Sequence, residues 1–219
     1  YRSESIRNFP DFVETIKEFG SKSINSIHDF PVSFANSKIS FLNNQHLEVD
    51  EIPDGITFIK SPKGTGKTTS LTNILEKLLR RKFLSIMDFE EESFNDPDLS
   101  LNTPYRVLLI GHRVALIKDL CNRLGLNCYL DDNPSSSLSR KQKYGVCLDS
   151  LRNVQFHSYD MVIIDESEQV LSHFLADTLK DRETIFHLLD VIVFTTKKVV
   201  ALDADIGWTS YLTLNWMKR

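Results

Sequence analysis

Positive charge is not in surplus in this sequence of 219 residues, which carries 26 lysines and arginines against 30 aspartates and glutamates, for a formal net charge of -4. Domains that bind nucleic acid through their overall electrostatics usually show a basic face or stripe. The composition therefore gives no support for nucleic-acid binding. Any such function has to be argued from motifs.

Cysteine is also scarce: the chain has three, namely Cys121, Cys128 and Cys147. Their odd number and their spacing exclude the paired patterns that are typical of a zinc site or a disulfide framework. We therefore expect reduced thiols that pack as small hydrophobic side chains, in a reducing, cytoplasmic compartment.

Long apolar runs are missing as well. No segment approaches the ~18 apolar residues of a membrane span, and no basic stretch followed by an apolar run opens the chain. We expect a soluble protein with no membrane partner. The sequence starts without Met at Tyr1 and stops at Arg219 with no tail, so we also expect it to be a piece of a longer protein.

What the sequence does contain is an alternation of strand and helix patterns that begins near residue 51. Residues 1–50 are polar and mixed, with one helical pattern across Phe12, Ile16 and Phe19, and we assign this N-terminal extension no role. In residues 51–219, short apolar runs alternate with helical stretches, which is typical of an α/β domain with a mostly parallel sheet. The expected strands are 56–59, 106–110, 145–148, 161–164 and 199–202, and the expected helices are 67–81, 114–124 and 182–194. Residues 88–104 and 131–143 are expected to be surface loops.

The strongest motif follows the first expected strand and opens the first expected helix of the domain. It comprises Ser61, Pro62, Lys63, Gly64, Thr65, Gly66, Lys67, Thr68 and Thr69. The glycines allow backbone N–H groups to surround an anion, the helix N-terminus adds positive charge, and Lys67 can reach the β- and γ-phosphates of ATP. Thr68 would then ligate Mg²⁺. The alternative is a glycine-rich turn beside a surface lysine, and a second motif argues against it.

That second motif is an apolar strand, 161–164, which runs into Asp165 and Glu166. In a parallel sheet, the carboxyl ends of the strands line one crevice, so the two acids are expected to face the phosphate loop. Asp165 is suited to hold Mg²⁺, and Glu166 to polarise the attacking water. Two acids at a strand end can also be an ordinary solvated helix start, but the phosphate loop favours chemistry.

These segments resemble the first RecA-like domain of superfamily-2 helicases, and more closely the replication origin-binding helicases of herpesviruses and of plasmid or large-virus replication. Residues 61–68 resemble motif I, 107–116 motif Ia, 145–151 the Ib region and 165–168 motif II. Residues 199–205 stand where motif III would be, and there the resemblance implies that Asp203 and Asp205 couple ATP to DNA. The departures are Ser61 in place of the usual first glycine, an unfamiliar form of motif II, and the lack of motifs IV to VI.

The resemblance implies the N-terminal ATPase lobe of a DNA helicase that acts in the initiation of replication. It implies Mg²⁺ and ATP as cofactors, Lys67, Asp165 and Glu166 as catalytic residues, and a second RecA-like lobe, outside this chain, as a partner. Other replication proteins are further candidate partners. Single-stranded DNA, and duplex DNA as a second candidate, would be held by loops that follow the strands. The candidate DNA contacts there are His112, Arg113, Ser150 and Arg152. The basic cluster of Arg140, Lys141 and Lys143 is a weaker candidate, because such a run is usually only solvated.

Two other functions remain open at this stage. One is a different P-loop motor, such as the ATPase of a DNA-packaging terminase, which shares the phosphate loop and the paired acids. The other is a nucleotide-binding assembly module that does not hydrolyse ATP. The segments that resemble motifs Ia and Ib favour the helicase.

Overall fold

The strands form one six-stranded sheet in which every pair of neighbours is parallel. A computed structural model describes residues 8–20, 47, 49, 51–90, 105–133, 136–156 and 158–218. The order across the sheet is β1-β6-β5-β2-β4-β3. The strands are β1 (Gly55–Lys60), β2 (Val107–Gly111), β3 (Asn127–Cys128), β4 (Lys143–Cys147), β5 (Met161–Asp165) and β6 (Lys198–Asp203). This is the α/β fold that the alternating pattern predicted, and it is consistent with a RecA-like P-loop domain.

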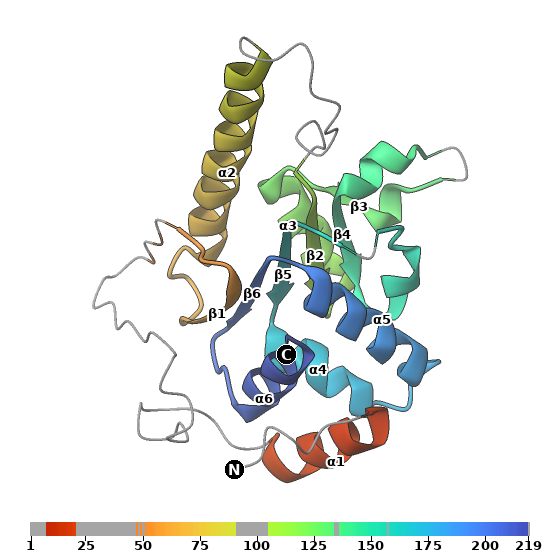
Figure 1. Ribbon diagram of the computed structural model, residues 1–219. Helices are drawn as coiled ribbons and strands as arrows, with labels where there is room; N and C mark the ends of the chain where they lie inside the picture. Colours follow the sequence, from red (N-terminus) through yellow and green to blue (C-terminus); the bar gives the residue numbers. More distant parts are fainter. Residues whose placement is uncertain are drawn as a thin grey trace.

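Both faces of the sheet are covered by helices (Figure 1). Successive residues of a strand point to opposite faces, so Leu108 and Ile110 of β2 join one core cluster and Val107 and Leu109 the other. The first cluster packs against α4 (Ser167–Ser172), α5 (Arg182–Thr195) and α6 (Trp208–Met217). The second packs against α2 (Lys67–Glu90) and α3 (Val114–Leu124). Strands buried on both faces need nearly continuous apolar sequence, which is why β2 and β5 could be recognised from the sequence.

A helix from the N-terminal extension is part of this core. Helix α1 (Phe9–Phe19) begins after Asn8, whose side chain accepts a hydrogen bond from the backbone N–H of Asp11, and it matches the helical pattern expected there. Phe12 is fully buried, with its ring centroid 4.5 Å from that of Phe186 and 5.5 Å from that of Phe174. Figure 1 shows α1 beside α6, close to the C-terminal end of the chain. Most of the rest of the extension lies outside the described residues.

Several elements differ from the expected boundaries. Helix α2 runs to Glu90, so residues 88–90 are helical and not loop, while 91–104 lie outside the described residues. Strand β4 ends at Cys147, and the 3₁₀ helix η5 (Leu148–Asn153) starts at once. Strand β3, helix α6 and the short helices η3 (Tyr129–Asp131), η4 (Leu138–Gln142) and η6 (His173–Leu175) were not expected. None of the described helices is both long enough and apolar enough to cross a membrane.

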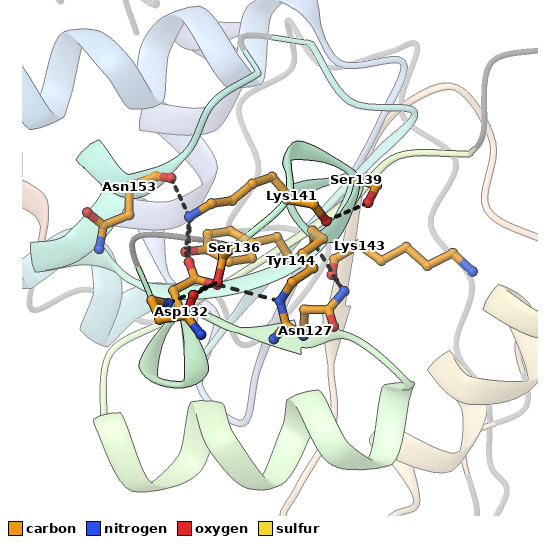
Figure 2. Close-up of polar contacts among 11 residues, drawn as sticks. Asn127, Asp132, Ser136, Ser139, Lys141, Lys143, Tyr144 and Asn153 are labelled. Carbon is orange, nitrogen blue, oxygen red and sulfur yellow. Dashed lines mark hydrogen bonds and ion pairs between the residues drawn. The ribbon is translucent and has the colours of Figure 1, made fainter.

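The Ser-rich segment between β3 and β4 is fastened by Lys141 (Figure 2). Its ammonium lies 2.5 Å from Oδ2 of Asp132, 2.7 Å from the hydroxyl of Tyr144 and 3.2 Å from the carbonyl oxygen of Asn153. The side chain of Lys141 is only 12% exposed. Burial alone would raise the pKa of Asp132, but Lys141 and Tyr144 hold it below its ordinary value. Lys141 therefore holds the loop in place through a partly buried ion pair, which leaves it a poor candidate for a phosphate contact.

The three cysteines are buried and free, as expected. Cys121 of α3 packs directly on β4, and a Cβ atom added at Gly145 would lie 2.1 Å from its sulfur atom. Burial raises the pKa of Cys121 to about 12, so the thiol stays protonated. Gly145 therefore allows the close approach of α3 to the sheet.

Candidate functional site

The carboxyl edge of the sheet gathers the segments that the sequence analysis singled out. The phosphate loop follows β1, Asp203 ends β6, and Asp165 ends β5, and these three strands are neighbours in that order. His112 follows β2 and η5 follows β4, the next two strands across the sheet. The backbone N–H of Ser61 donates to the carbonyl oxygen of Asp203 over 3.0 Å, which ties the start of the loop to β6.

The loop between β1 and α2 has the backbone form that an anion site requires. Gly64 and Gly66 adopt φ angles of 82° and 78°, a left-handed conformation that costs glycine little. The hydroxyl groups of Ser61 and Thr65 lie 2.5 Å apart, and that of Thr65 also donates to the carbonyl oxygen of Pro62 over 2.8 Å. Ser61, which replaces the usual first glycine, is therefore accommodated by a hydrogen bond inside the loop.

Lys67, the first residue of α2, folds back over this loop. Its ammonium donates to the carbonyl oxygen of Ser61 and, over 3.1 Å, to that of Pro62. The first turn of α2 contains no acidic side chain, so its positive end is not neutralised from within the helix. Thr68 is partly buried beside Lys67, whereas Thr69 and the loop residues Pro62 and Lys63 are exposed. An anion at this position would meet both Lys67 and the helix N-terminus.

Asp165 and Glu166 form an acidic pair at the end of β5. Burial, with a smaller contribution from the neighbouring Glu166 carboxylate, raises the pKa of Asp165 to about 6, and the charge of Lys67 opposes this rise. Glu166 has a φ angle of 52°, which places a non-glycine residue in the left-handed region. Oε2 of Glu166 is buried and has no hydrogen-bond partner among the described residues. Backbone strain and an unpartnered buried oxygen are both typical of functional positions.

These residues fit Mg²⁺-ATP. A hydroxyl and a carboxylate, those of Thr68 and Asp165, are hard oxygen ligands of the kind that Mg²⁺ prefers. A cation between the paired acids would remove the repulsion that helps to raise the pKa of Asp165. Gly64, Gly66 and Lys67 could hold the phosphates.

The raised pKa of Asp165 leads to a prediction about the stability of the fold. A carboxyl group with a folded-state pKa above its unfolded value stabilises the fold at low pH, and this contribution is lost as the pH rises through about 6. From the difference of about two pH units, Asp165→Asn is expected to stabilise the metal-free protein by about 2–3 kcal/mol above pH 7. The advantage should shrink as the pH falls below about 6 and disappear below the ordinary value of 3.8, where Asp165 is protonated in both states.

Urea denaturation at pH 7.5 and pH 4.5 measures this effect, with Asp177→Asn as the control because Asp177 is fully exposed. A stabilisation that is the same at both pH values would contradict the assigned cause. Added Mg²⁺ is expected to reduce the difference between Asp165→Asn and the wild type at pH 7.5.

Motif II is joined to β6 and α6 through Glu168 and Asp203. Oε1 of Glu168 accepts hydrogen bonds from the backbone N–H groups of Gly207 and Ser210 over 2.7 and 2.9 Å, and so caps the N-terminus of α6. Oδ2 of Asp203 accepts from the backbone N–H of Glu168, and Oδ1 accepts from that of Asp205, both over 3.0 Å. Any movement of the acidic pair would therefore reach α6.

Coupling was expected from Asp203 and Asp205, whereas Glu168 was included in motif II without a role of its own. The side chain of Asp203 contacts motif II, whereas Asp205 takes part through its backbone and its side chain is exposed. Gly207, the N-cap residue of α6, has no side chain that could cap the helix. The lack of a local cap was the one feature of the sequence that indicated a capping side chain from elsewhere in the chain.

The candidate DNA contacts lie on the neighbouring strand ends, after β2 and β4, and both arginines among them have polar partners within the chain. The guanidinium of Arg113 donates to Oε1 of Gln169 over 3.4 Å, and that of Arg152 pairs with Asp181 over 2.7 Å. Arg152 and Asp181 are 47% and 61% exposed, so this pair is weak enough for a phosphate group to replace it. Ser150 is partly buried in η5.

Fold and site together define an α/β domain whose phosphate-loop motif and paired acids share one sheet edge. No model of a known protein family matches the chain. It is 34% identical over 189 residues to a protein of Acanthamoeba polyphaga mimivirus that is provisionally named a helicase; the match covers 78% of this chain and 15% of that protein. A second mimivirus protein, provisionally named a replication origin-binding protein, is 29% identical over 175 residues, or 72% of this chain and 19% of its own length.

The replication origin-binding protein of Gallid herpesvirus 2 is 25% identical over 162 residues, which are 69% of this chain and 17% of that protein. The chain is thus similar to proteins named for replication origin binding and for helicase activity. It spans about a sixth of the length of these relatives.

Proposed function

We propose that this chain is the ATP-binding and ATP-hydrolysing N-terminal lobe of a DNA helicase that acts in the initiation of replication, in a reducing, cytoplasmic compartment. The observation that carries the proposal is the shared sheet edge, where the loop bearing Lys67 and the pair Asp165–Glu166 flank the end of β6. Similarity to replication origin-binding proteins and to a provisionally named helicase supports the choice of DNA replication over other ATP-driven processes.

Each residue of the site has a distinct task in this proposal. The backbone N–H groups around Gly64 and Gly66 bind the phosphates, and Lys67 turns from the loop carbonyls to the β- and γ-phosphates. When bound, Mg²⁺ neutralises phosphate charge, and Thr68 and Asp165 hold it. Glu166 orients the attacking water and accepts its proton. Glu168 and Asp203 pass the resulting movement to α6.

DNA binds beside this site in the proposal, at the loops after β2 and β4. Arg113, Ser150 and Arg152 contact the phosphates of one strand, which is a mode of binding that does not read sequence and weakens with salt. With a net charge of -4, the whole chain does not attract DNA over long distances. The local cations therefore have to bind the DNA phosphates at short range.

The test is ATP hydrolysis by the full-length protein that contains this chain, with single-stranded and duplex DNA as separate stimulants. The expected result is hydrolysis that rises with single-stranded DNA and is abolished in Lys67→Ala. Turnover that ignores DNA would point to another P-loop motor. Tight ATP binding without turnover in the full-length protein would point to an assembly module.

Replacing both Arg113 and Arg152 by Ala is expected to weaken binding of single-stranded DNA and leave ATP binding unchanged. Loss of two phosphate contacts lowers affinity most at low salt, so the slope of log K against log salt should become shallower by about 1.4. Fluorescence anisotropy of a labelled oligonucleotide measures both effects. Arg123→Ala is the matched control, because Arg123 is an exposed arginine near the opposite end of α3, paired with Asp119. Unchanged DNA affinity would remove both arginines from the proposed site.

A further inference from the structure

A series of titratable side chains in contact with one another lies beside the acidic pair at the carboxyl edge of the sheet. Nε2 of His173, in η6, lies 2.7 Å from Oδ1 of Asp149, in η5. The ring of His173 also meets that of His112 edge to face, with centroids 4.8 Å apart and an interplanar angle of 67°. The side chain of His173 is 14% exposed and that of Asp149 is 57% exposed, so this series of side chains begins at the solvent with Asp149 and continues inward.

The strand register brings His112 next to Glu166. Ile110 of β2 pairs with Ile164 of β5, and each strand ends one residue later, directly before His112 and Glu166. The charge of Glu166 also acts on the pKa of His112, as expected for two side chains that follow neighbouring strand ends. Neighbouring strands lie ~4.8 Å apart. On the other side of β2, Gly111 pairs with Cys147 of β4, and Asp149 follows two residues later. Glu166, His112 and Asp149 therefore form a row at one edge of the sheet, just beyond the ends of three neighbouring strands.

Two buried polar atoms in this row lack partners. Neither Nδ1 of His112 nor Oε2 of Glu166 has a hydrogen-bond partner among the described residues. An imidazole N–H and a carboxylate oxygen are complementary, and leaving a buried polar group unsatisfied costs ~1–3 kcal/mol. Burial lowers the pKa of His112, as do the nearby His173 and Arg113, and Glu166 and Asp149 oppose this shift. The ring is therefore neutral at physiological pH, with a single N–H to donate.

We propose that His112 is a positioning residue for Glu166. In the ATP-bound protein its ring N–H binds Oε2 of the carboxylate, while the pair His173–Asp149 holds the ring in place. This inference rests on the proposed function, because Glu166 needs orientation only if it directs water. It gives His112 a role other than the DNA contact expected from the sequence. Asp149 is adjacent to Ser150 in η5, so the same chain of contacts links the proposed DNA loop to the catalytic carboxylate.

The experiment compares His112→Phe and His112→Asn in the full-length protein. Phe keeps a ring for packing but has no N–H, and it is expected to lower kcat roughly 10- to 100-fold with little change in the KM for ATP or in DNA affinity. Asn places an amide N–H near the position of Nδ1 and is expected to restore most of the activity. In a Glu166→Gln background, His112→Phe should have no further effect, because the two residues act through one step.

Wild-type activity in His112→Phe would overturn the inference and leave the proposed function intact. A loss of DNA affinity with full kcat at saturating DNA would also overturn it, and would make His112 a DNA contact. If the wild type shows no turnover, the proposed function fails, and ¹⁵N NMR of the His112 ring still decides the inference. A change in the Nδ1 signal on addition of Mg²⁺ and a non-hydrolysable ATP analogue should occur in the wild type and be absent in Glu166→Ala, which has no acceptor for the ring N–H. The same change in both proteins would overturn the inference.

Discussion

Glu166→Gln is expected to lower kcat for DNA-stimulated ATP hydrolysis by ~10²–10⁴-fold, which is the usual contribution of a positioned general base. Gln keeps the size of the side chain and can still accept a hydrogen bond from water, but it cannot take up the proton. Since Glu166 follows the end of β5 and the proposed phosphate ligands lie in the loop after β1, ATP affinity should be retained. Removal of a negative charge near the γ-phosphate should make ATP bind somewhat more tightly.

Single-turnover hydrolysis and binding of a non-hydrolysable analogue separate these two effects. Lys67→Ala provides the contrast, because it is expected to lose ATP affinity as well as turnover. Glu183→Gln is the matched control, since Glu183 is an exposed residue, 69% accessible, on α5. If Glu166→Gln keeps full turnover, Glu166 is not the base, and its strained backbone and buried oxygen need another explanation.

The strands and the motifs at their ends could be predicted because their signals are local. Apolar runs such as that of β5 are required by burial on both faces of the sheet, and the glycines of the phosphate loop are required by its backbone conformation. Their meeting at one sheet edge follows from parallel pairing, which alternating strands and helices imply.

Contacts between residues distant in the sequence could not be predicted in this way. Glu168 caps α6 through Gly207 and Ser210, which lie 39 and 42 positions further along the sequence. No local pattern around Glu168 indicates this contact. In the sequence Lys141 is part of a basic run that is expected to be solvated. Its partly buried contacts with Asp132 and Tyr144 arise only when the fold brings these residues together. The left-handed conformation of Glu166 is likewise set by packing and not by its residue type.

The meeting of His112, His173 and Asp149 has the same origin. The three residues come from separate segments of the sequence, and only the fold brings them together beside Glu166. A histidine after a buried strand was therefore interpreted as a DNA contact, which is the simplest role for a polar residue at a strand end.

The isolated chain is expected to bind ATP weakly, to hydrolyse it ~10³–10⁵-fold more slowly than the full-length protein, and not to unwind duplex DNA. In the mechanism that the helicase resemblance implies, a second lobe supplies an arginine that stabilises charge on the γ-phosphate. Within the described part of this chain, Arg113 and Arg152 are bonded to Gln169 and Asp181 instead. Lys67 contacts the phosphate loop, and in the proposed function it binds ATP in its ground state as well as in the transition state.

Single-turnover hydrolysis by the isolated chain and by the full-length protein, both at saturating ATP, measures the difference. Circular dichroism and binding of a fluorescent ATP analogue serve as controls that the isolated chain is folded. Adding the second lobe as a separate polypeptide should recover part of the rate, and substitution of its arginine should prevent that recovery. Robust unwinding by the isolated chain would contradict the proposal, because this chain would then have to complete the transition-state site with its own residues.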